Sequence, residues 1–514
     1  MAKFEIKDGV AIIPEGTIEI GENAFQDCTF LESVTIPESV IEIGGYAFDG
    51  CTSLRSITIP DGIEKIGIKA FRGCKSLKSV TIPESVTVIG DEDEDGYQAC
   101  DVFSGCAALE RIVVAKGNPI YDSREGCNAI IRTETNNLLH GCKSTIIPKS
   151  VTRLGAGAFS DRTSLKSIVI PKGVEVIDHY AFSGCISLKN VTIPESVTYI
   201  GPDAFSGCVS LKSIIIPASV SEIQGFAFER CPSLESIVVV DGNPVYDSRE
   251  GCNAIIETQN NTLLFGCKST IIPESVIEIG GSAFYGCTSL ESVVIPKGVK
   301  EIGGLSFKDC TSLKSVTIPE SVKAINAHAF QGCTSLESIV LPKGVDEIGH
   351  YTFSGCTSLK NVTIPESVTY IGSEAFSGCF SLKSIIIPES VECIGREVFS
   401  GCTSLEYIVM HKGVKRINRR TFKDCISLKS ITIPESVTAI ETNAFDGCTS
   451  LKEITLPESV TELEEDSLYG YKKRALDECS ALTAIYVPAG KAEFYYKRLS
   501  VKLHEKIVEL EPEK

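Results

Sequence analysis

The sequence lacks several features that mark common classes of protein. None of its apolar runs approaches the ~18 residues that a membrane-spanning helix needs. The formal net charge of −18 at pH 7 argues against a general affinity for nucleic-acid phosphates or anionic lipid. Tryptophan is absent, and the two methionines are Met1 and Met410. We therefore expect a protein that neither inserts into a membrane nor binds nucleic acid.

Signals for catalysis and for metal binding are also missing. The histidines are scattered over the chain, and none recurs with a carboxylate and a nucleophile as a hydrolytic triad requires; they are His140, His179, His328, His350, His411 and His504. No C-x-x-C motif occurs, and no cysteine–histidine spacing suits zinc. No glycine-rich loop could hold a phosphate. The sequence therefore predicts a protein that is not an enzyme and has no cofactor.

One phrase, by contrast, is repeated along almost the whole chain. Residues 193–215 read IPESVTYIGPDAFSGCVSLKSII, and the next residues, IPASVSEIQGFAF, begin the phrase again. Its proline recurs in steps of 23 residues, for example at Pro14, Pro37, Pro60 and Pro83. In a typical copy phenylalanine follows eleven residues after the proline, cysteine three later, and then L-x-x-I-x-I. The repeat specifies a shape rather than a chemistry.

The repeat length determines how the copies must pack. A 23-residue coil cannot bury its own apolar face, so it must stack on its neighbours. The alternation L-x-x-I-x-I predicts a short strand with one buried face, and stacked copies would pair at about 4.8 Å as a parallel sheet. We predict a solenoid of about twenty coils over residues 14–488, after a capping strand in residues 1–13. The apolar spacing in residues 489–514 predicts a C-terminal helical cap.

The repeated phrase closely resembles the BspA-like class of leucine-rich repeats. The resemblance implies an α/β-type solenoid, a right-handed superhelix with a parallel β-sheet on the concave face, few regular helices and irregular convex segments. It also implies binding to other proteins, because members are typically surface or secreted proteins of bacteria and some protozoa, and several are adhesins. One departure is that Ser39 and Gly62 occupy the place of the usual asparagine, so we expect no asparagine ladder there.

Two longer copies, near residues 115–147 and 240–272, interrupt the 23-residue step. In each, an N-A-I-I run, a polar turn and a second apolar pair predict a β-hairpin insertion. Cys127 with Cys142, and Cys252 with Cys267, stand 15 residues apart, and each pair could either close the hairpin as a disulfide or face the core. The cysteines of the ordinary coils are expected to be free, buried thiols.

If the protein binds a partner, the exposed strand positions should make the contact. Two places before the proline the residue alternates between threonine and valine or isoleucine, so we expect a flat surface without a ligand-sized concavity. Positions where a coil departs from the repeated phrase are further candidates for contact residues. One coil has Glu406, Tyr407, His411 and Lys412, where tyrosine stands beside charge as in many binding hot spots; drift in a single coil is the alternative.

Two tyrosine–arginine pairs form a second candidate, in the longer copies. They are Tyr121 with Arg124 and Tyr246 with Arg249. Their identity in both copies could equally reflect shared ancestry or the folding of the hairpin, and we favour a structural role for them.

A weak calcium motif lies in the acidic insertion DEDEDGYQACDV. Asp91, Asp93 and Asp95 resemble the opening of a calcium loop, but Val102 stands where the bidentate glutamate should be. A solvated acidic loop is the alternative.

The sequence thus predicts a non-enzymatic protein-binding scaffold, active in adhesion or contact with a host or partner. The alternative is a structural spacer or surface-assembly module without a specific ligand. The resemblance points to the cell surface or to secretion, whereas the N-terminal residues MAKFEIKDGVAII contain no secretory core and the many thiols suit the cytoplasm.

Overall fold

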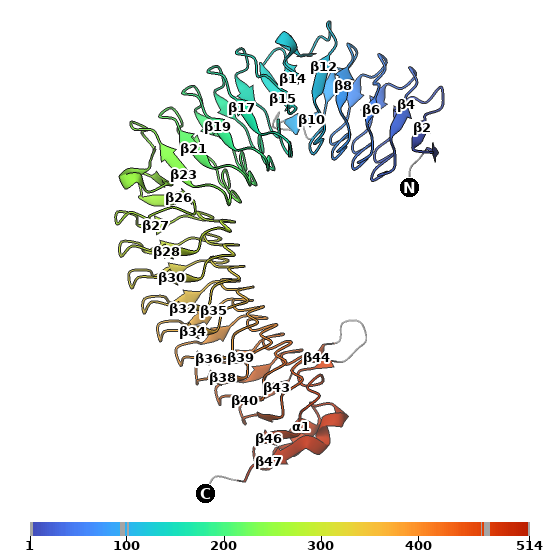
Figure 1. Ribbon diagram of the computed structural model, residues 1–514. Coiled ribbons are helices and arrows are strands. Elements are labelled where there is room, and N and C mark those ends of the chain that lie inside the picture. The colour runs from blue at the N-terminus through green and yellow to red at the C-terminus, as the bar shows by residue number, and fades with distance from the viewer. Residues whose placement is uncertain (1–3, 93–97, 100–101, 464, 467–472, 512–514) are drawn as a thin grey trace. The chain divides into compact units, whose positions relative to one another are not determined.

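The computed structural model describes residues 4–92, 98–99, 102–463, 465–466 and 473–511. The chain divides into two compact units, Met1–Ser248 and Arg249–Lys514. Each unit is a β-solenoid of stacked coils with very few helices (Figure 1). The predicted fold class, a solenoid of parallel strands, is therefore confirmed.

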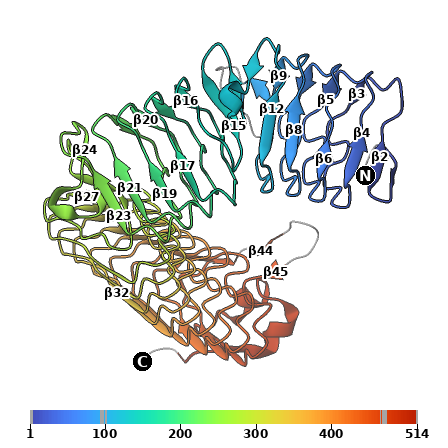
Figure 2. The same ribbon diagram turned by 45° about the horizontal axis from the view of Figure 1, so that its top comes forward.

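In the first unit the L-x-x-I-x-I segments form the predicted parallel strands, which we call the primary strands. They are β2 (Val10–Ile12), β4 (Ser33–Thr35), β6 (Ser56–Ile57), β8 (Ser79–Ile82), β12 (Arg111–Val114), β17 (Ser167–Val169), β19 (Asn190–Thr192), β21 (Ser213–Ile216) and β23 (Ser236–Val239). The strands β17, β19, β21 and β23 pair in that order and lie side by side in Figure 2. Equivalent residues face each other across the pairs, so Ser167 lies opposite Asn190 and Asn190 opposite Ser213.

A second ladder of two-residue strands runs along each unit, where irregular segments were expected. In the first unit it comprises β3 (Glu19–Ile20), β5 (Glu42–Ile43), β7 (Lys65–Ile66) and β9 (Val88–Ile89), then β16 (Arg153–Leu154), β18 (Val176–Ile177), β20 (Tyr199–Ile200) and β22 (Glu222–Ile223). A strand of two residues is too short to show alternation, so the sequence pattern could not reveal it. The glycine that follows β7 is required by packing, because a Cβ on Gly67 would lie 2.5 Å from the backbone nitrogen of Gly45.

The second unit repeats this plan. Its primary strands are β28 (Ser292–Val294), β30 (Ser315–Thr317), β32 (Ser338–Val340), β34 (Asn361–Thr363), β36 (Ser384–Ile387), β38 (Tyr407–Met410), β40 (Ser430–Thr432), β42 (Glu453–Thr455) and β46 (Ala484–Val487). Its two-residue strands are β27 (Glu278–Ile279), β29 (Glu301–Ile302), β31 (Ala324–Ile325), β33 (Glu347–Ile348), β35 (Tyr370–Ile371), β37 (Cys393–Ile394), β39 (Arg416–Ile417), β41 (Ala439–Ile440) and β43 (Glu462–Leu463).

The chain ends are closed by short elements. At the N-terminus β1 (Ile6–Lys7) pairs antiparallel with β2. At the C-terminus one short helix, α1 (Ala492–Tyr496), precedes a 3-10 helix, Val501–Lys506, and a strand, β47 (Ile507–Glu509), that pairs with β46. Buried Leu499 and Leu503 pack on the core, so the helical part of the expected cap is present, and a strand is added to it.

Both predicted hairpin insertions are confirmed. In the first, β14 (Ala129–Arg132) pairs antiparallel with β15 (Asn137–Gly141), and β15 then joins the second ladder through β16. In the second, β25 (Ala254–Glu257) pairs antiparallel with β26 (Thr262–Gly266), which continues into β27.

Rows of identical side chains fill the core of each unit. Successive phenylalanine rings are stacked, as in Phe25 on Phe48, with centroids 5.0 Å apart. Most row cysteines donate their S–H to the phenylalanine carbonyl of the preceding coil, as Cys51 does to Phe25 at 3.1 Å. The buried thiol is therefore both an apolar filler and a hydrogen-bond donor.

Serine stands in several coils at the position where leucine-rich repeats usually have asparagine, and its side chain can link neighbouring coils. The hydroxyl of Ser39 donates to the carbonyl of Thr17 at 2.8 Å and accepts from the backbone nitrogen of Gly16 at 3.1 Å. Ser219 donates likewise to Val197 at 2.7 Å. Serine therefore joins neighbouring coils in part of the turn, whereas the hydroxyls of Ser321, Ser390 and Ser459 at the same position have no partner.

Candidate binding surface

The solvent-facing side of the primary strands carries a continuous row of exposed residues. We call the residues two places before each proline the outer row. In the first unit the outer row includes Val169, Thr192, Ile215 and Val238, and in the second unit it includes Val294, Thr317, Val340, Thr363, Ile386, Val409 and Thr432. Its valines and isoleucines stay in solvent, with Val169 81% and Val294 73% exposed, while the alternate residue Val293 is 7% exposed. The surface is weakly polar and interrupted by apolar side chains.

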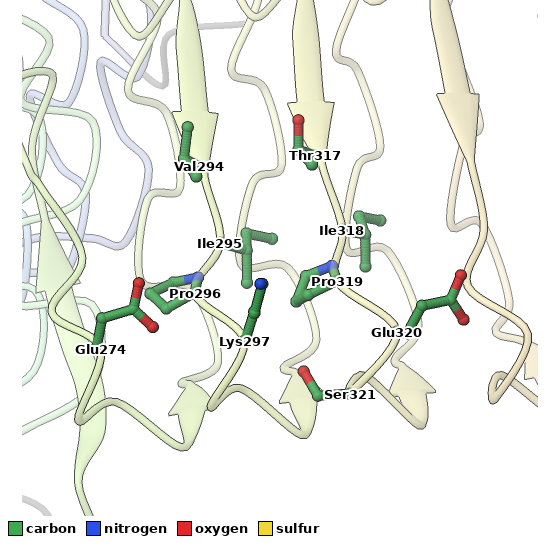
Figure 3. A pocket seen from close by; sticks show the side chains of 10 residues that line it. All are labelled: Glu274, Val294, Ile295, Pro296, Lys297, Thr317, Ile318, Pro319, Glu320 and Ser321. Atoms are coloured by element: carbon green, nitrogen blue, oxygen red, sulfur yellow. The ribbon is translucent and has the colours of Figure 1, made fainter.

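A groove crosses this surface in the second unit, between the coils of β28 and β30 (Figure 3). It has a volume of about 520 Å³. Val294 and Thr317 of the outer row border it, with Pro296 and Pro319 below them. The expectation of a surface without a concavity of this size is therefore wrong here, because the side chains of adjacent coils leave a hollow that the repeat pattern does not reveal.

Charged side chains stand at the lower end of the groove. Lys297 lies between Glu274 and Glu320, which come from the two neighbouring coils (Figure 3). An apolar floor with charges at one end can take a side chain or a short turn of another polypeptide.

The coil of β38 places its candidate residues at both ends of the strand. Tyr407 is 54% exposed at the start, with the ammonium of Lys429 5.5 Å from its ring centroid. Lys429 also pairs with Glu406 and lowers the pKa of that carboxyl. His411 and Lys412 are exposed beyond the other end. The backbone nitrogen of His411 donates to the carbonyl of Ile387 at 3.3 Å, a bond that the usual proline cannot make.

The tyrosines of the longer copies are not available for contact. Tyr121 is 1% and Tyr246 5% exposed. Each hydroxyl accepts a hydrogen bond from a backbone nitrogen of the second ladder, that of Ile89 at 3.2 Å and that of Ile223 at 3.1 Å. The prediction that these tyrosines bind a partner is therefore wrong, because both rings are buried. They pack inside the longer copies, which agrees with the structural role.

The arginines of these copies also act within the fold. Arg124 donates to Asn136 at 2.7 Å and pairs with Asp122. Burial raises the pKa of Asp122, but the bonds from Arg124 outweigh it and leave that pKa lowered. Arg249 donates to Asn261 at 2.8 Å and to Ser275 at 3.3 Å. These side chains therefore hold the hairpins in place.

The comparisons with known proteins address the family. A model of the BspA-type leucine-rich repeat region, with six copies, matches residues 9–118, 135–248, 264–383 and 369–497. The chain belongs to the BspA-type leucine-rich repeat family. Among curated proteins the chain has no match.

Solved structures similar to this BspA-type chain come from several bacteria. A leucine-rich repeat protein of Bacteroides ovatus is 28% identical over 88% of each chain, with a TM-score of 0.37. One from Eubacterium ventriosum is 21% identical over 86% of this chain and 90% of that one, with a TM-score of 0.45. A leucine rich cell surface protein of Faecalibacterium prausnitzii is 22% identical over 95% and 89%, with a TM-score of 0.28.

One BspA-type coil has a buried charge that the sequence analysis missed. Arg162 replaces the row cysteine and is 1% exposed. It donates to the carbonyls of Gly141 at 2.8 Å and Phe103 at 2.6 Å, while its Nη2 has no partner. His140 beside it is also buried, its Nε2 has no partner, and burial and the charge of Arg162 lower its pKa to about 3. The signal was the pair Asp161–Arg162 where the phrase has glycine and cysteine.

The cysteines of the BspA-type coils are free thiols throughout the part of the chain that the structure describes. Cys142 and Cys267 each donate to a backbone carbonyl at 3.4 Å. The core-facing alternative for the paired cysteines therefore holds. Burial raises the pKa of the row thiols, that of Cys51 to about 12. Cys393, on the second ladder, is exposed.

The calcium motif falls largely outside the structure. Asp93 and Asp95 lie beyond the described residues, and Asp91 belongs to β10 (Asp91–Glu92), which pairs with β11 (Gln98–Ala99). Among the residues with described positions, no three His, Cys, Asp or Glu side chains gather as a metal site. Within the same residues no helix has the length and apolar character to cross a membrane.

Proposed function

We propose that this chain is a non-enzymatic scaffold that binds a protein partner through the outer row, in adhesion or contact with a host at the cell surface. The observation that carries the proposal is the exposure of apolar outer-row residues, such as Val340 at 68% and Ile386 at 59%. Ile386 also lies beside exposed Val409 of the next coil, and contiguous exposed apolar surface is typical of interaction sites. The family resemblance supports the extracellular location.

The regular spacing of the coils adds to this argument. The parallel register places Val340 beside Thr363 of the next coil. In the same way it places Ile386 beside Val409 of the coil that follows it. A partner can therefore make the same contact on several coils, and each small burial adds to the others at roughly 25 cal/mol per Å². A long flat surface of this kind suits another protein better than a small molecule.

Tyr407 is the proposed centre of contact in the second unit. It replaces a small residue on the exposed side, and the nearby Lys429 holds its ring by a cation–π contact of 5.5 Å. Tyrosine with a preorganised ring is a frequent binding hot spot. Glu406, His411 and Lys412 would then form a charged rim around it.

The experiment is capture of purified host matrix proteins by the full chain and by variants. Val340→Ser with Ile386→Ser removes two apolar outer-row residues, and Tyr407→Ser tests the hot spot alone. The matched control is Phe380→Ser with Ile426→Ser, since these residues are 50% and 45% exposed but lie in the turn after the row cysteine. His411→Pro cannot separate binding from folding as well, because it also deletes the backbone hydrogen bond from residue 411 to Ile387.

The proposal predicts that the outer-row variant and Tyr407→Ser both lose binding and the control keeps it, with unchanged far-UV circular dichroism for all. Capture of no matrix protein, or equal loss in the control, would support the alternative role as a structural spacer.

A further inference from the structure

Three lysines stand side by side along one edge of the four-stranded sheet of the first unit. Lys166, Lys189 and Lys212 directly precede β17, β19 and β21. Their backbones are hydrogen-bonded in sequence, Lys189 nitrogen to Lys166 oxygen at 3.1 Å and Lys212 nitrogen to Lys189 oxygen at 3.2 Å. The strands beside them lie side by side in Figure 2. We call these three residues the lysine row.

In several other coils a lysine at the same position lies beside a glutamate of the neighbouring coil and forms an ion pair. Lys314 pairs with Glu291 at 2.9 Å, and Lys360 pairs with Glu337 at 2.8 Å. The lysine row forms no ion pair with any carboxylate in the described part of the chain. Like charges on adjacent strands destabilise a sheet, so the row costs stability that a bound anionic group would restore.

The surrounding sequence is basic in an acidic protein. Residues 143–217 contain eight Lys and Arg against five Asp and Glu, a net charge of +3, whereas the whole chain carries −18. The window offset by 171 residues, 314–388, repeats much of the same sequence with five basic and six acidic residues, a net charge of −1. Residues 218–239, which include β23, add three acidic residues and one basic residue and reduce the net charge to +1. The positive charge is therefore confined to the coils of β17, β19 and β21.

An apolar row runs beside the lysine row on the same sheet. Val169 is 81% and Ile215 54% exposed, each three residues after its lysine. A ligand that satisfies both rows needs negative charge on one side and apolar groups on the other.

We infer that the face of β17, β19 and β21 binds an acidic protein segment, with carboxylates on the lysine row and apolar side chains on Val169 and Ile215. The site ends at β23, because Glu235 takes the next place after Lys212 in the row. The inference rests on the proposed protein-binding function and adds the chemistry of the partner. A sulfated polysaccharide has no apolar side chains for the second row. A row of three lysines is also smaller than the clusters of about four to eight basic residues that bind anionic membranes.

The test is fluorescence anisotropy with a short labelled peptide in which Asp and Glu alternate with Val and Leu. Lys189→Glu with Lys212→Glu in the full chain should weaken its binding at least about tenfold, because two attractions become repulsions. Lys360→Glu with Lys383→Glu is the control, since it makes the same charge change at the offset of 171 residues and should alter affinity less than about twofold. Replacing the acidic residues of the peptide with lysine should abolish binding.

Three results would overturn the inference. One is equal loss in both variant pairs, which would indicate a general charge effect. Another is no binding of the acidic peptide. The third is binding of heparin or of phosphatidylglycerol vesicles, with loss in Lys189→Glu/Lys212→Glu, in preference to the peptide. If the outer-row variants of the second unit still lose a matrix protein in any of these cases, the proposed function stands and only the partner chemistry fails.

Discussion

The rings of Phe307 and Phe330 stack with centroids 5.2 Å apart and planes within 3° of parallel. Phe330 is fully buried and also stacks on Phe353 at 5.7 Å. Each coil of the second unit therefore depends on the coils on either side of it for the environment of its largest core side chain.

Phe330→Ala should lower the free energy of unfolding by about 3–5 kcal/mol, because it removes a buried ring and leaves a cavity. Phe30→Ala is the control, since Phe30 is 61% exposed and its loss should cost less than about 0.5 kcal/mol. Urea unfolding followed by far-UV circular dichroism measures both. Similar costs for the two variants would contradict the buried row.

Stability should fall on acidification in a way that depends on His140. Burial and Arg162 lower the pKa of His140 from 6.5 to about 3 in the folded chain. The unfolded chain binds the proton first, so the contribution of His140 is complete above pH 6.5 and is lost as the pH falls toward 3. The loss is about 1.4 kcal/mol per pH unit within that window.

His140→Phe removes this titrating group and should therefore flatten the pH dependence of the free energy of unfolding. Phenylalanine is the matched replacement, because Phe265 occupies the equivalent place in the second hairpin copy. The measurement is urea unfolding at several pH values between 3 and 7 for both proteins. Parallel stability curves would show that His140 is not a buried neutral base.

Arg162 should be replaceable by the residue that the other coils use. In the second hairpin copy Cys287 donates to the carbonyl of Gly266 at 3.8 Å, the bond that corresponds to Arg162 Nε with Gly141. His140→Phe with Arg162→Cys reproduces that arrangement and removes a buried charge, so it should stabilise the chain by about 2 kcal/mol. A clear loss of stability would mean that the two bonds of Arg162 outweigh its desolvation.

Native thiol reactivity should distinguish Cys393 from the row cysteines. Burial raises the pKa of Cys402 to about 12, so at pH 8 almost none of that thiol is ionised, and reagents cannot reach it. Iodoacetamide labelling of native protein, followed by peptide mass spectrometry, should modify Cys393 well before Cys402. The Cys393→Ser variant identifies its signal, and comparable rates at both sites would contradict the burial of the row.

The repeat made the fold predictable and left its exceptions hidden. A period of 23 residues requires stacking, and one alternating segment per copy defines a strand, so the solenoid and its core followed from Phe25, Cys28, Leu31 and their counterparts. Two-residue strands such as Glu42–Ile43 show no alternation and were missed. The groove at Val294 and Thr317 arises from side-chain packing between coils, which no single copy encodes.

Some candidate residues could not be sorted from sequence for a related reason. Tyr121 and Tyr407 are both tyrosines that depart from the phrase, yet one is buried against a backbone nitrogen and the other lies in solvent. Arg162 departs from the phrase in the way that an exposed polar substitution would, and only its burial distinguishes it. Exposure depends on neighbouring coils, and the phrase alone does not give it.

The most direct test of the outer row as the binding surface is site-specific photocross-linking. A photoreactive phenylalanine analogue replaces Thr363, in the outer row, or Phe380, in the turn after the row cysteine, and each protein is irradiated with purified matrix proteins. The account predicts a cross-linked partner from position 363 and none from position 380. Cross-linking from position 380 alone would contradict it.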